Sequence, residues 1–220
     1  MKDKKYILSL AVAYLCYFTH GMQAIMLQQN KVNFFQQWGY TDEVAGAAAV
    51  SLVVTATGFG KLLTVWIGGE ISDKIGRKVM AVAGSVLYVI CLAGLLFSNS
   101  FAVACVFGVL LGAANSGFWD ACLYPAVQEA APKYPGSALI GIKLFVSIAG
   151  IIYPLTVVYF ANIGKWKINI LIPLILSVVC VLLSMIAKFA YDDELKKVKG
   201  TGEVKSKKFI DPEIEKAKAR

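Results

Sequence analysis

The sequence is poor in charge: Asp, Glu, Lys and Arg together make up 16% of its 220 residues. Soluble globular domains usually carry about 25%, and this chain is in addition 58% hydrophobic with a mean hydropathy of +0.65. The shortage excludes an ordinary water-soluble domain. The sequence contains long stretches without Asp, Glu, Lys or Arg, such as 6–30 and 79–119, and these are long enough to cross a lipid bilayer.

Residues typical of catalytic and metal sites are scarce as well. The chain has one histidine, and its cysteines form no C-x-x-C pair. All five cysteines stand in apolar segments, where we interpret them as small buried hydrophobes. They are Cys16, Cys91, Cys105, Cys122 and Cys180. With no nucleotide-binding loop, metal-ligand cluster or activated nucleophile, the sequence predicts neither an enzyme nor a metal site. It predicts no cofactor beyond a coupling ion, H⁺ or Na⁺.

The net charge of +8 does not indicate a nucleic-acid-binding protein. The basic residues stand at the edges of apolar stretches and in the C-terminal tail, whereas nucleic acid requires one continuous patch. Basic residues at membrane edges are explained by the bias of Lys and Arg toward cytoplasmic loops. We therefore expect lipids, and no nucleic acid, among the partners.

The apolar stretches predict an all-α polytopic membrane protein with six spans. Ser98–Ser100 divides one long stretch in two, and the breaker cluster Pro132–Gly136 ends another. The predicted spans are residues 6–28, 44–69, 79–97, 101–131, 137–160 and 168–189. Residues 191–220 form a basic tail rich in Lys and Glu, which we expect to be mobile.

The distribution of basic residues predicts that both termini are cytoplasmic. With the N-terminus inside, seven basic residues outside the tail fall on the inner side and three on the outer side. The inner residues are Lys2, Lys4, Lys5, Lys74, Arg77, Lys78 and Lys133, and the outer ones are Lys31, Lys165 and Lys167. The opposite topology would place the basic tail outside. We expect a multi-pass protein of the cell membrane.

A dense island of charge, Gly69 to Lys78, separates the second span from the third. Its spacing is G-x-x-x-D-[R/K]-x-G-R-[R/K], and every motif position is filled. The filled positions are Gly69, Asp73, Lys74, Gly76, Arg77 and Lys78. In this helix–loop–helix context the island resembles the signature loop of major facilitator superfamily transporters, and the six spans with a basic tail resemble the N-terminal half of such a protein.

The resemblance implies a fold and a mechanism. Members of the family are built from two six-helix halves, each an inverted 3+3 repeat, which rock to alternate access to a central site. It implies that Asp73 caps a helix of the other half, that Arg77 pairs with Glu129 at the end of span four, and that Gly69 and Gly76 allow close approach and the turn. One departure is that span four lacks the arginine carried by many proton-coupled members, which leaves proton coupling by that element open.

Three charges fall inside predicted spans, well away from the span ends: Lys61, Asp120 and Lys143. At about 1.5 Å per residue all three lie at comparable depth in the cytoplasmic half. Such groups are costly in hydrocarbon and face a cavity or one another. Either Asp120 balances one lysine while the other attracts an anionic group of a substrate, or the set is a structural ion pair plus a lysine that extends to the interface.

Uncharged polar residues extend this candidate cavity. Asn115 and Trp119 accompany Asp120 in span four, and Tyr17, His20 and Gln23 share a face of span one. Polar groups beside an aromatic plane suit a sugar or an organic acid. The alternatives are an aromatic packing stripe, and a hydrogen-bonded packing histidine instead of a proton relay.

Together these features predict a secondary active transporter, or half of one, that moves a small polar solute such as a sugar or an organic anion. Its partner would be a second six-helix half, either a copy of this chain or a separate chain, unless the sequence is a fragment. Two alternatives stay open: a half-size transporter acting as a homodimer, and a six-helix membrane scaffold that does not transport.

Overall fold

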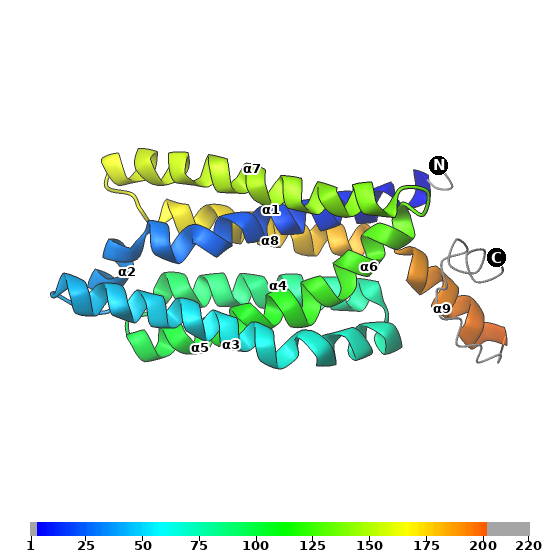
Figure 1. The fold of residues 1–220 in the computed structure, drawn as a ribbon, viewed down its shortest axis with the longest axis horizontal. Helices are drawn as coiled ribbons and strands as arrows, with labels where there is room; N and C mark the ends of the chain where they lie inside the picture. Colours follow the sequence, from blue (N-terminus) through cyan, green and yellow to red (C-terminus); the bar gives the residue numbers. More distant parts are fainter. Residues whose placement is uncertain (1–3, 202–220) are drawn as a thin grey trace, which may run out of the picture.

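The computed structural model describes residues 4–201, and the chain in this range is helical throughout apart from its connections (Figure 1). Six helical runs are long and apolar enough to cross a membrane, which confirms the predicted fold class. They are α1 (Ile7–Gln29), α3 (Glu43–Ile75), α4 (Arg77–Phe97), the continuous run of α5 (Phe101–Gly112), η2 (Ala113–Asp120) and α6 (Ala121–Ala130), α7 (Pro135–Asn162) and α8 (Ile168–Ile186). The shorter helices are η1 (Lys4–Tyr6), α2 (Lys31–Gln37) and α9 (Ala190–Thr201). Lys2 and residues 202–220 of the predicted tail lie outside the described residues.

The helices begin where the sequence supplies suitable caps. The carboxylate of Asp42 accepts a hydrogen bond from the backbone N–H of Ala45 at 2.7 Å and so caps α3. Pro135 occupies the first turn of α7, where its missing N–H costs nothing. These local signals fix the helix starts independently of the packing.

Residues 31–37 connect the first predicted span to the second. They form helix α2, because its aromatic residues Phe34 and Phe35 are buried in the bundle. Gln37 then donates hydrogen bonds to three backbone carbonyls at the end of α4, the shortest of them 2.6 Å from Nε2 to the carbonyl oxygen of Ser98. The segment therefore packs mainly against α3, is bonded to the end of α4 through Gln37, and closes this end of the bundle.

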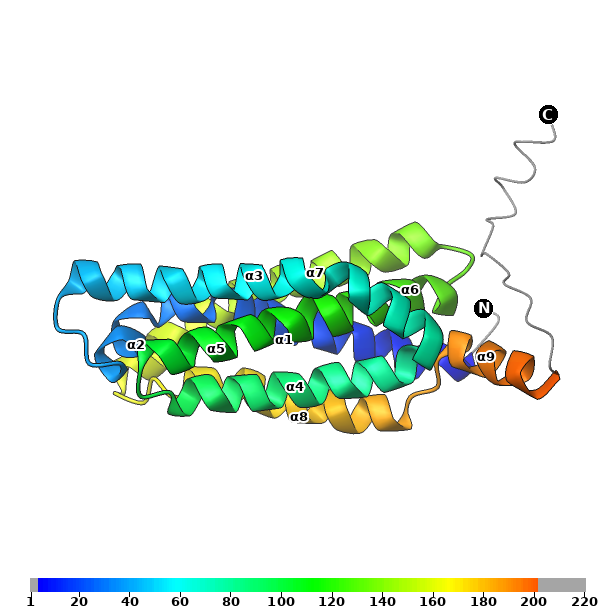
Figure 2. The same cartoon turned by 90° about the horizontal axis from the view of Figure 1, so that it is seen from below.

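The bundle has an internal two-fold relation (Figure 2). Helices α3 and α7 lie on one face, α4 and α8 lie on the opposite face, and α1 and α5 lie between them. Exchanging the first three spans for the last three converts the α1–α7 packing into α3–α5, and α1–α8 into α4–α5, while α4–α8 maps onto itself. Because each triplet crosses an odd number of times, the two triplets run in opposite directions. This is an inverted 3+3 repeat.

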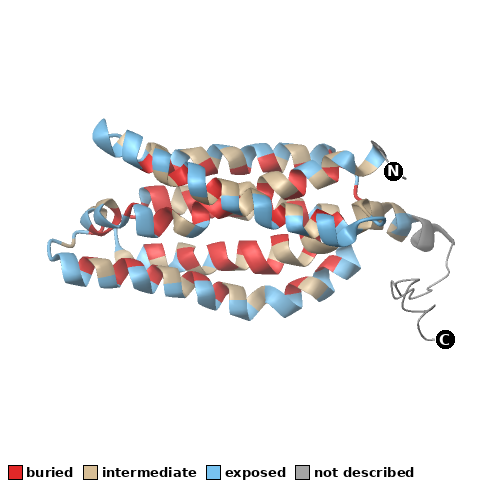
Figure 3. Cartoon of the chain, turned by 45° about the horizontal axis from the view of Figure 1, so that its top comes forward, coloured by how far each residue is buried: buried red, intermediate tan, exposed pale blue. Residues whose placement is uncertain are grey.

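The two helices of one face are less covered than the other four spans (Figure 3). In their most apolar windows, 22% of the residues of α3 and 17% of those of α7 are buried, against 56% for α1 and 50% for α4. The exposed side chains on α3 and α7 are mostly large and apolar, among them Trp66 and Leu155. We name this surface the α3/α7 face.

The first and last described helices, η1 and α9, lie at the same end of the bundle (Figure 1). The α3–α4 and α6–α7 connections are at this end too, and α2 is at the other. An even number of crossings requires this arrangement.

Small residues let α3 lie directly against the fourth span. A Cβ atom added at Gly60 would collide with the carbonyl oxygen of Val109, and one at Gly112 with the carbonyl oxygen of Thr57. Both clashes involve backbone, so no side-chain rotation relieves them. Without water to drive association, such close backbone contact is what stabilises helix pairs in lipid.

Gly60 and its neighbour Gly58 provide a matched test of this packing, because a Cβ atom at Gly58 would meet nothing within 4 Å. We expect Gly60→Ala to lower the free energy of unfolding by about 1–3 kcal/mol through overpacking. Gly58→Ala is expected to stabilise slightly, since alanine is the better helix former. Thermal unfolding of the detergent-solubilised variants measures both. Equal effects of the two substitutions would contradict the proposed contact.

Candidate functional site

The connection between α3 and α4 is tighter than a loop. Helix α3 continues through the charged island as far as Ile75, and Gly76 alone makes the turn, with φ +102° and ψ 157°. A positive φ of this size strains any residue with a Cβ atom, so the turn needs glycine. Gly69 does not have the expected packing role: it lies inside α3, and nothing lies within 4 Å of its would-be Cβ. Its neighbour Gly68 makes the close approach instead, against the backbone of Gly117.

Arg77, the first residue of α4, is the centre of the charged island. Its side chain is only 7% exposed. Nη1 donates to the Asp73 carboxylate and to the Ser72 hydroxyl, both at 2.7 Å, and Nη2 donates to the Glu129 carboxylate of α6 at 3.2 Å. The structure thus brings Arg77 and Glu129 together, as the resemblance implies, and one guanidinium joins α3, α4 and α6.

The other charged residues of the island are less constrained. Lys74 pairs with Glu70 at 3.7 Å, and both side chains are more than 70% exposed, so this pair contributes little. Lys78 is half-buried in the first turn of α4. The second carboxylate oxygen of Glu129 is buried and has no hydrogen-bond donor among the described residues. A carboxylate with one oxygen unpaired can accept a new partner when the helices shift.

Deeper in the bundle, Asp120 is the centre of a second polar cluster. One of its carboxylate oxygens accepts a hydrogen bond from the hydroxyl of Tyr17 on α1 at 2.6 Å. The other accepts from the hydroxyl of Ser116 at 2.9 Å. These bonds keep the carboxylate oriented between α1 and the fourth span.

The segment that carries this cluster is not an ordinary α-helix. Residues Ala113–Asp120 form η2, an eight-residue π-helix between α5 and α6. π-helical turns are rare, cost stability and occur frequently at functional sites. The predicted cavity residues of span four, Asn115, Trp119 and Asp120, all belong to it. Sequence patterns based on the α-helical repeat do not reveal such a segment.

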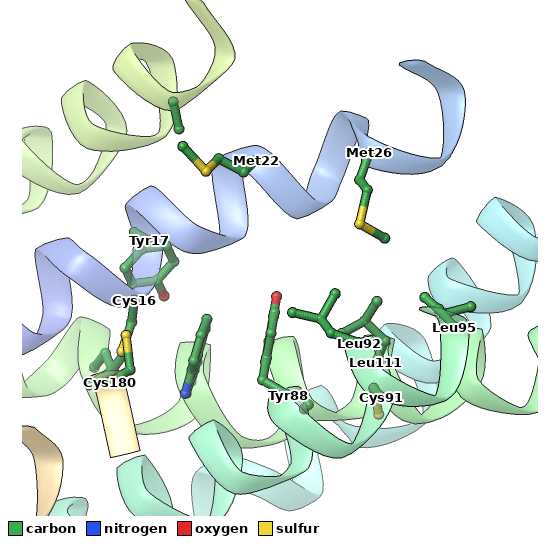
Figure 4. Packing of buried hydrophobic residues seen from close by; sticks show 14 of the residues in the cluster. Cys16, Tyr17, Met22, Met26, Tyr88, Cys91, Leu92, Leu95, Leu111 and Cys180 are labelled. Carbon is green, nitrogen blue, oxygen red and sulfur yellow. The ribbon is translucent and has the colours of Figure 1, made fainter. Parts of the chain in front are cut away.

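Tyr88 of α4 connects the polar residues of α1 to this segment. Its hydroxyl lies 2.8 Å from Nδ1 of His20 and donates to Gln23 at 3.3 Å. Figure 4 shows Tyr17 extending from α1 and Tyr88 extending from α4 into the space between the two helices. The sequence patterns missed Tyr88, because it lies in an otherwise apolar span.

Trp119 does not offer the open aromatic plane expected of it. The indole is fully buried and stacks on Tyr88, with 3.9 Å between ring centroids and 7° between planes, and its N–H donates to Ser85 at 3.2 Å. Trp119 therefore packs the core. Asn115 is buried beside it, and its side-chain amide nitrogen has no acceptor among the described residues.

The two intramembrane lysines do not form the expected ion pair with Asp120. Hydroxyl groups satisfy the carboxylate instead, and among the described residues no salt bridge involves Lys61 or Lys143. Lys61 is half-buried on α3, and Lys143 is exposed on α7. The Lys143 ammonium lies 5.8 Å from the ring centroid of Tyr124, whose edge contacts Tyr17 at 5.2 Å between centroids. Both lysines thus belong to the helices of the α3/α7 face.

Metal-binding residues do not gather in the described part of the chain. No group of three or more His, Cys, Asp or Glu side chains there is able to hold a metal ion. The cysteines are unpaired, and four of the five are buried.

Six apolar helices in two inverted triplets, with polar side chains at the centre, define a multi-pass membrane protein. The sequence profile of the Major Facilitator Superfamily matches residues 9–218. The chain belongs to this superfamily.

Several curated proteins are similar to parts of the chain. The uncharacterized MFS-type transporter YfkL of Bacillus subtilis is 41% identical over 149 residues, which are 68% of this chain and 36% of the relative. The inner membrane transport protein YdiM of Escherichia coli is 37% identical over 66% of this chain and 34% of its own length. YdiN of the same species is 32% identical over 84% and 42% respectively. The chain therefore spans less than half the length of these relatives.

The two ion pairs of the charged island allow a direct comparison. Arg77→Met leaves Glu129 without its counter-charge, and the Glu129 side chain is only 14% exposed. We expect a loss of about 2–4 kcal/mol in the free energy of unfolding, slightly below the full cost of breaking a buried pair. Lys74→Met removes an exposed pair and should cost less than about 1 kcal/mol. Thermal unfolding compares them, and a ranking in the reverse order would disprove the assigned role of Arg77.

Proposed function

We propose that this chain is one six-helix half of a secondary active transporter that moves a small polar solute by alternating access. The observation that carries the proposal is Asp120, an acid held by Tyr17 and Ser116 on a π-helix inside a membrane bundle. A charge inside the membrane is costly, so an ionisable residue there is by default a candidate for function. Membership of a transporter superfamily and the names of the relatives support the same function.

The solute site that we propose lies between Asp120 and the α3/α7 face. Lys61 and Lys143 bring two positive charges to this region, and Asp120 brings one negative charge. The amide of Asn115 supplies a further hydrogen-bond donor. This balance favours a solute with an anionic group and hydroxyl or carbonyl oxygens, such as an organic acid, over a neutral sugar.

We propose that the Arg77 cluster is the conformational switch of this transporter. Arg77 bonds to Asp73 in the last turn of α3 and to Glu129 on the fourth span. Rocking of the half requires these helices to shift, and bonds at the membrane edge are easily remade during such a movement. The bonds therefore stabilise one conformational state of the transporter, and their release permits the other conformational state.

The α3/α7 face is where we place the second six-helix unit. Its exposed apolar side chains and its two lysines lie on related helices of the inverted repeat. A second half would cover this face and complete the solute site. Both ends of this half are proposed to be cytoplasmic, in the cell membrane, because the basic residues gather at that end.

A non-transporting scaffold is the alternative function. The same apolar face would then bind a membrane partner, and the polar cluster around Asp120 would only fix the packing. Solute-dependent behaviour separates the two, because a scaffold has no reason to bind a solute at Asp120.

Asp73 provides a test of the switch. Its side chain is 64% exposed, so Asp73→Asn should change the free energy of unfolding by less than about 1 kcal/mol. We expect the substitution to slow transport at least tenfold while insertion and folding remain normal. Uptake into proteoliposomes of the complete transporter measures the rate, and Glu70→Gln in the same turn is the matched control. Unchanged uptake by Asp73→Asn would remove the switch role.

The solute class can be tested without a transport assay. A ligand that binds only the folded state raises the melting point, by an amount equivalent to about 2.7 kcal/mol at a hundredfold excess over its Kd. We expect small organic acids to stabilise the purified complete transporter more than sugars or amino acids do. The shift should vanish in Lys61→Gln and persist in Lys31→Gln, which alters α2 at the far end. Stabilisation by neutral sugars alone, unaffected by Lys61→Gln, would refute the anion site.

A further inference from the structure

The residues that follow α8 turn back onto the charged island. Phe189 is 1% exposed and anchors the chain in the core, and α9 begins at the next residue. The first turn of α9 then makes side-chain contacts with two separate parts of the molecule. We name Tyr191–Asp193 the clasp.

Tyr191 covers Arg77. The guanidinium carbon lies 4.4 Å from the centroid of the tyrosine ring, a cation–π distance. The hydroxyl donates a hydrogen bond to the backbone carbonyl of Asp73 at 2.8 Å. One side chain of α9 therefore contacts both partners of the Arg77–Asp73 bond.

Asp192 caps α4 from outside that helix. The residue before α4 is Gly76, which has no side chain able to accept a hydrogen bond from the first turn. The Asp192 carboxylate accepts one from the backbone N–H of Lys78 at 2.8 Å. A Cβ atom at Gly76 would collide with the other Asp192 oxygen. Gly76 thus makes the turn and also leaves room for the cap.

Asp193 joins the clasp to the N-terminal segment. Its carboxylate lies 2.7 Å from the Lys5 ammonium and accepts a hydrogen bond from the Tyr6 hydroxyl at 3.0 Å. The hydrogen bond to Asp193 raises the pKa of Lys5 above its ordinary value. Lys5 is solvent-exposed, so this contact orients the segment and adds little stability.

We propose that Tyr191 and Asp192 are positioning residues of the switch: they hold Arg77 and the start of α4 in the arrangement that bonds Arg77 to Glu129. The inference rests on the proposed function, since it assigns α9 the control of that same cluster. Release of α9 loosens Arg77, and loss of the Arg77 bonds loosens α9, because coupling between two sites is reciprocal. Movement of the chain beyond α8 is thereby linked to the state of the half.

Hydrogen–deuterium exchange of the full chain in detergent tests this coupling without any transported solute. In Asp192→Ala we expect amides of residues 77–81 to exchange roughly five to ten times faster, because a helix cap is lost. The decisive peptide covers residues 126–131 around Glu129, whose carboxylate bonds to Arg77, and it should also exchange faster. Helix α9 also contacts α6 directly, so the effect of Asp192→Ala on this peptide should disappear when the substitution is made in an Arg77→Met background. Conversely, Glu129→Gln should accelerate exchange in residues 189–196.

Three further variants control the experiment. Glu194→Ala alters an exposed residue of the same turn and should change none of these peptides. Tyr191→Phe keeps the ring on Arg77 and should retain most of the protection at Glu129, whereas Tyr191→Ala should lose it. If Asp192→Ala fails to fold, Asp192→Asn takes its place, because it removes the charge but keeps an oxygen that can accept a hydrogen bond.

Faster exchange confined to α9 and residues 77–81, with 126–131 unchanged in every variant, would overturn the proposal and leave the clasp a local structural contact. Because exchange needs no solute, a failure of the transport proposal leaves this result unaffected. In the complete transporter, Asp192→Ala is expected to lower the maximal uptake rate without changing the KM.

Discussion

The structure depends on how one buried guanidinium is neutralised. Arg77 sits where the chain leaves one membrane helix and enters the next, and its side chain is almost fully covered. A buried cation is tolerable only when every donor finds an acceptor. Asp73, Ser72 and Glu129 provide those acceptors, and each ties α4 to another part of the bundle. The short turn at Gly76 follows from this, because Arg77 must begin α4 directly beside the end of α3.

The polar cluster at Asp120 follows the same logic at greater depth. In hydrocarbon a carboxylate needs partners from neighbouring helices, and here two hydroxyls provide them. Tyr17 and Tyr88 then link the first, third and fourth spans through polar contacts. The π-helix holds buried polar groups, whereas Lys61 and Lys143 on α3 and α7 are half-buried and exposed respectively. A solute site at the junction of two halves likewise requires polar groups that have hydrogen-bond partners inside the membrane.

Local chemistry explains how far the sequence predicts this structure. Apolar length and breaker clusters predict the six spans, and the resemblance of the charged island to the signature loop of the family implies the Arg77–Glu129 contact. The π-helix escapes sequence reasoning because its residues still satisfy an α-helical pattern. Trp119 reads as an open aromatic plane because sequence does not show that Tyr88 covers it. The Lys- and Gly-rich composition of the tail favours a mobile segment and does not predict helix α9. Asp192 and Asp193 nevertheless supply the acidic first turn that favours a helix start.

A double-mutant cycle on Arg77 and Glu129 tests the central claim most directly. The unfolding free energies of Arg77→Met, Glu129→Gln and the double variant give the interaction between the two side chains. The account predicts a coupling of about 1–3 kcal/mol, with the double variant more stable than the sum of the single effects implies. Additive effects, with a coupling within about 0.5 kcal/mol of zero, would contradict it.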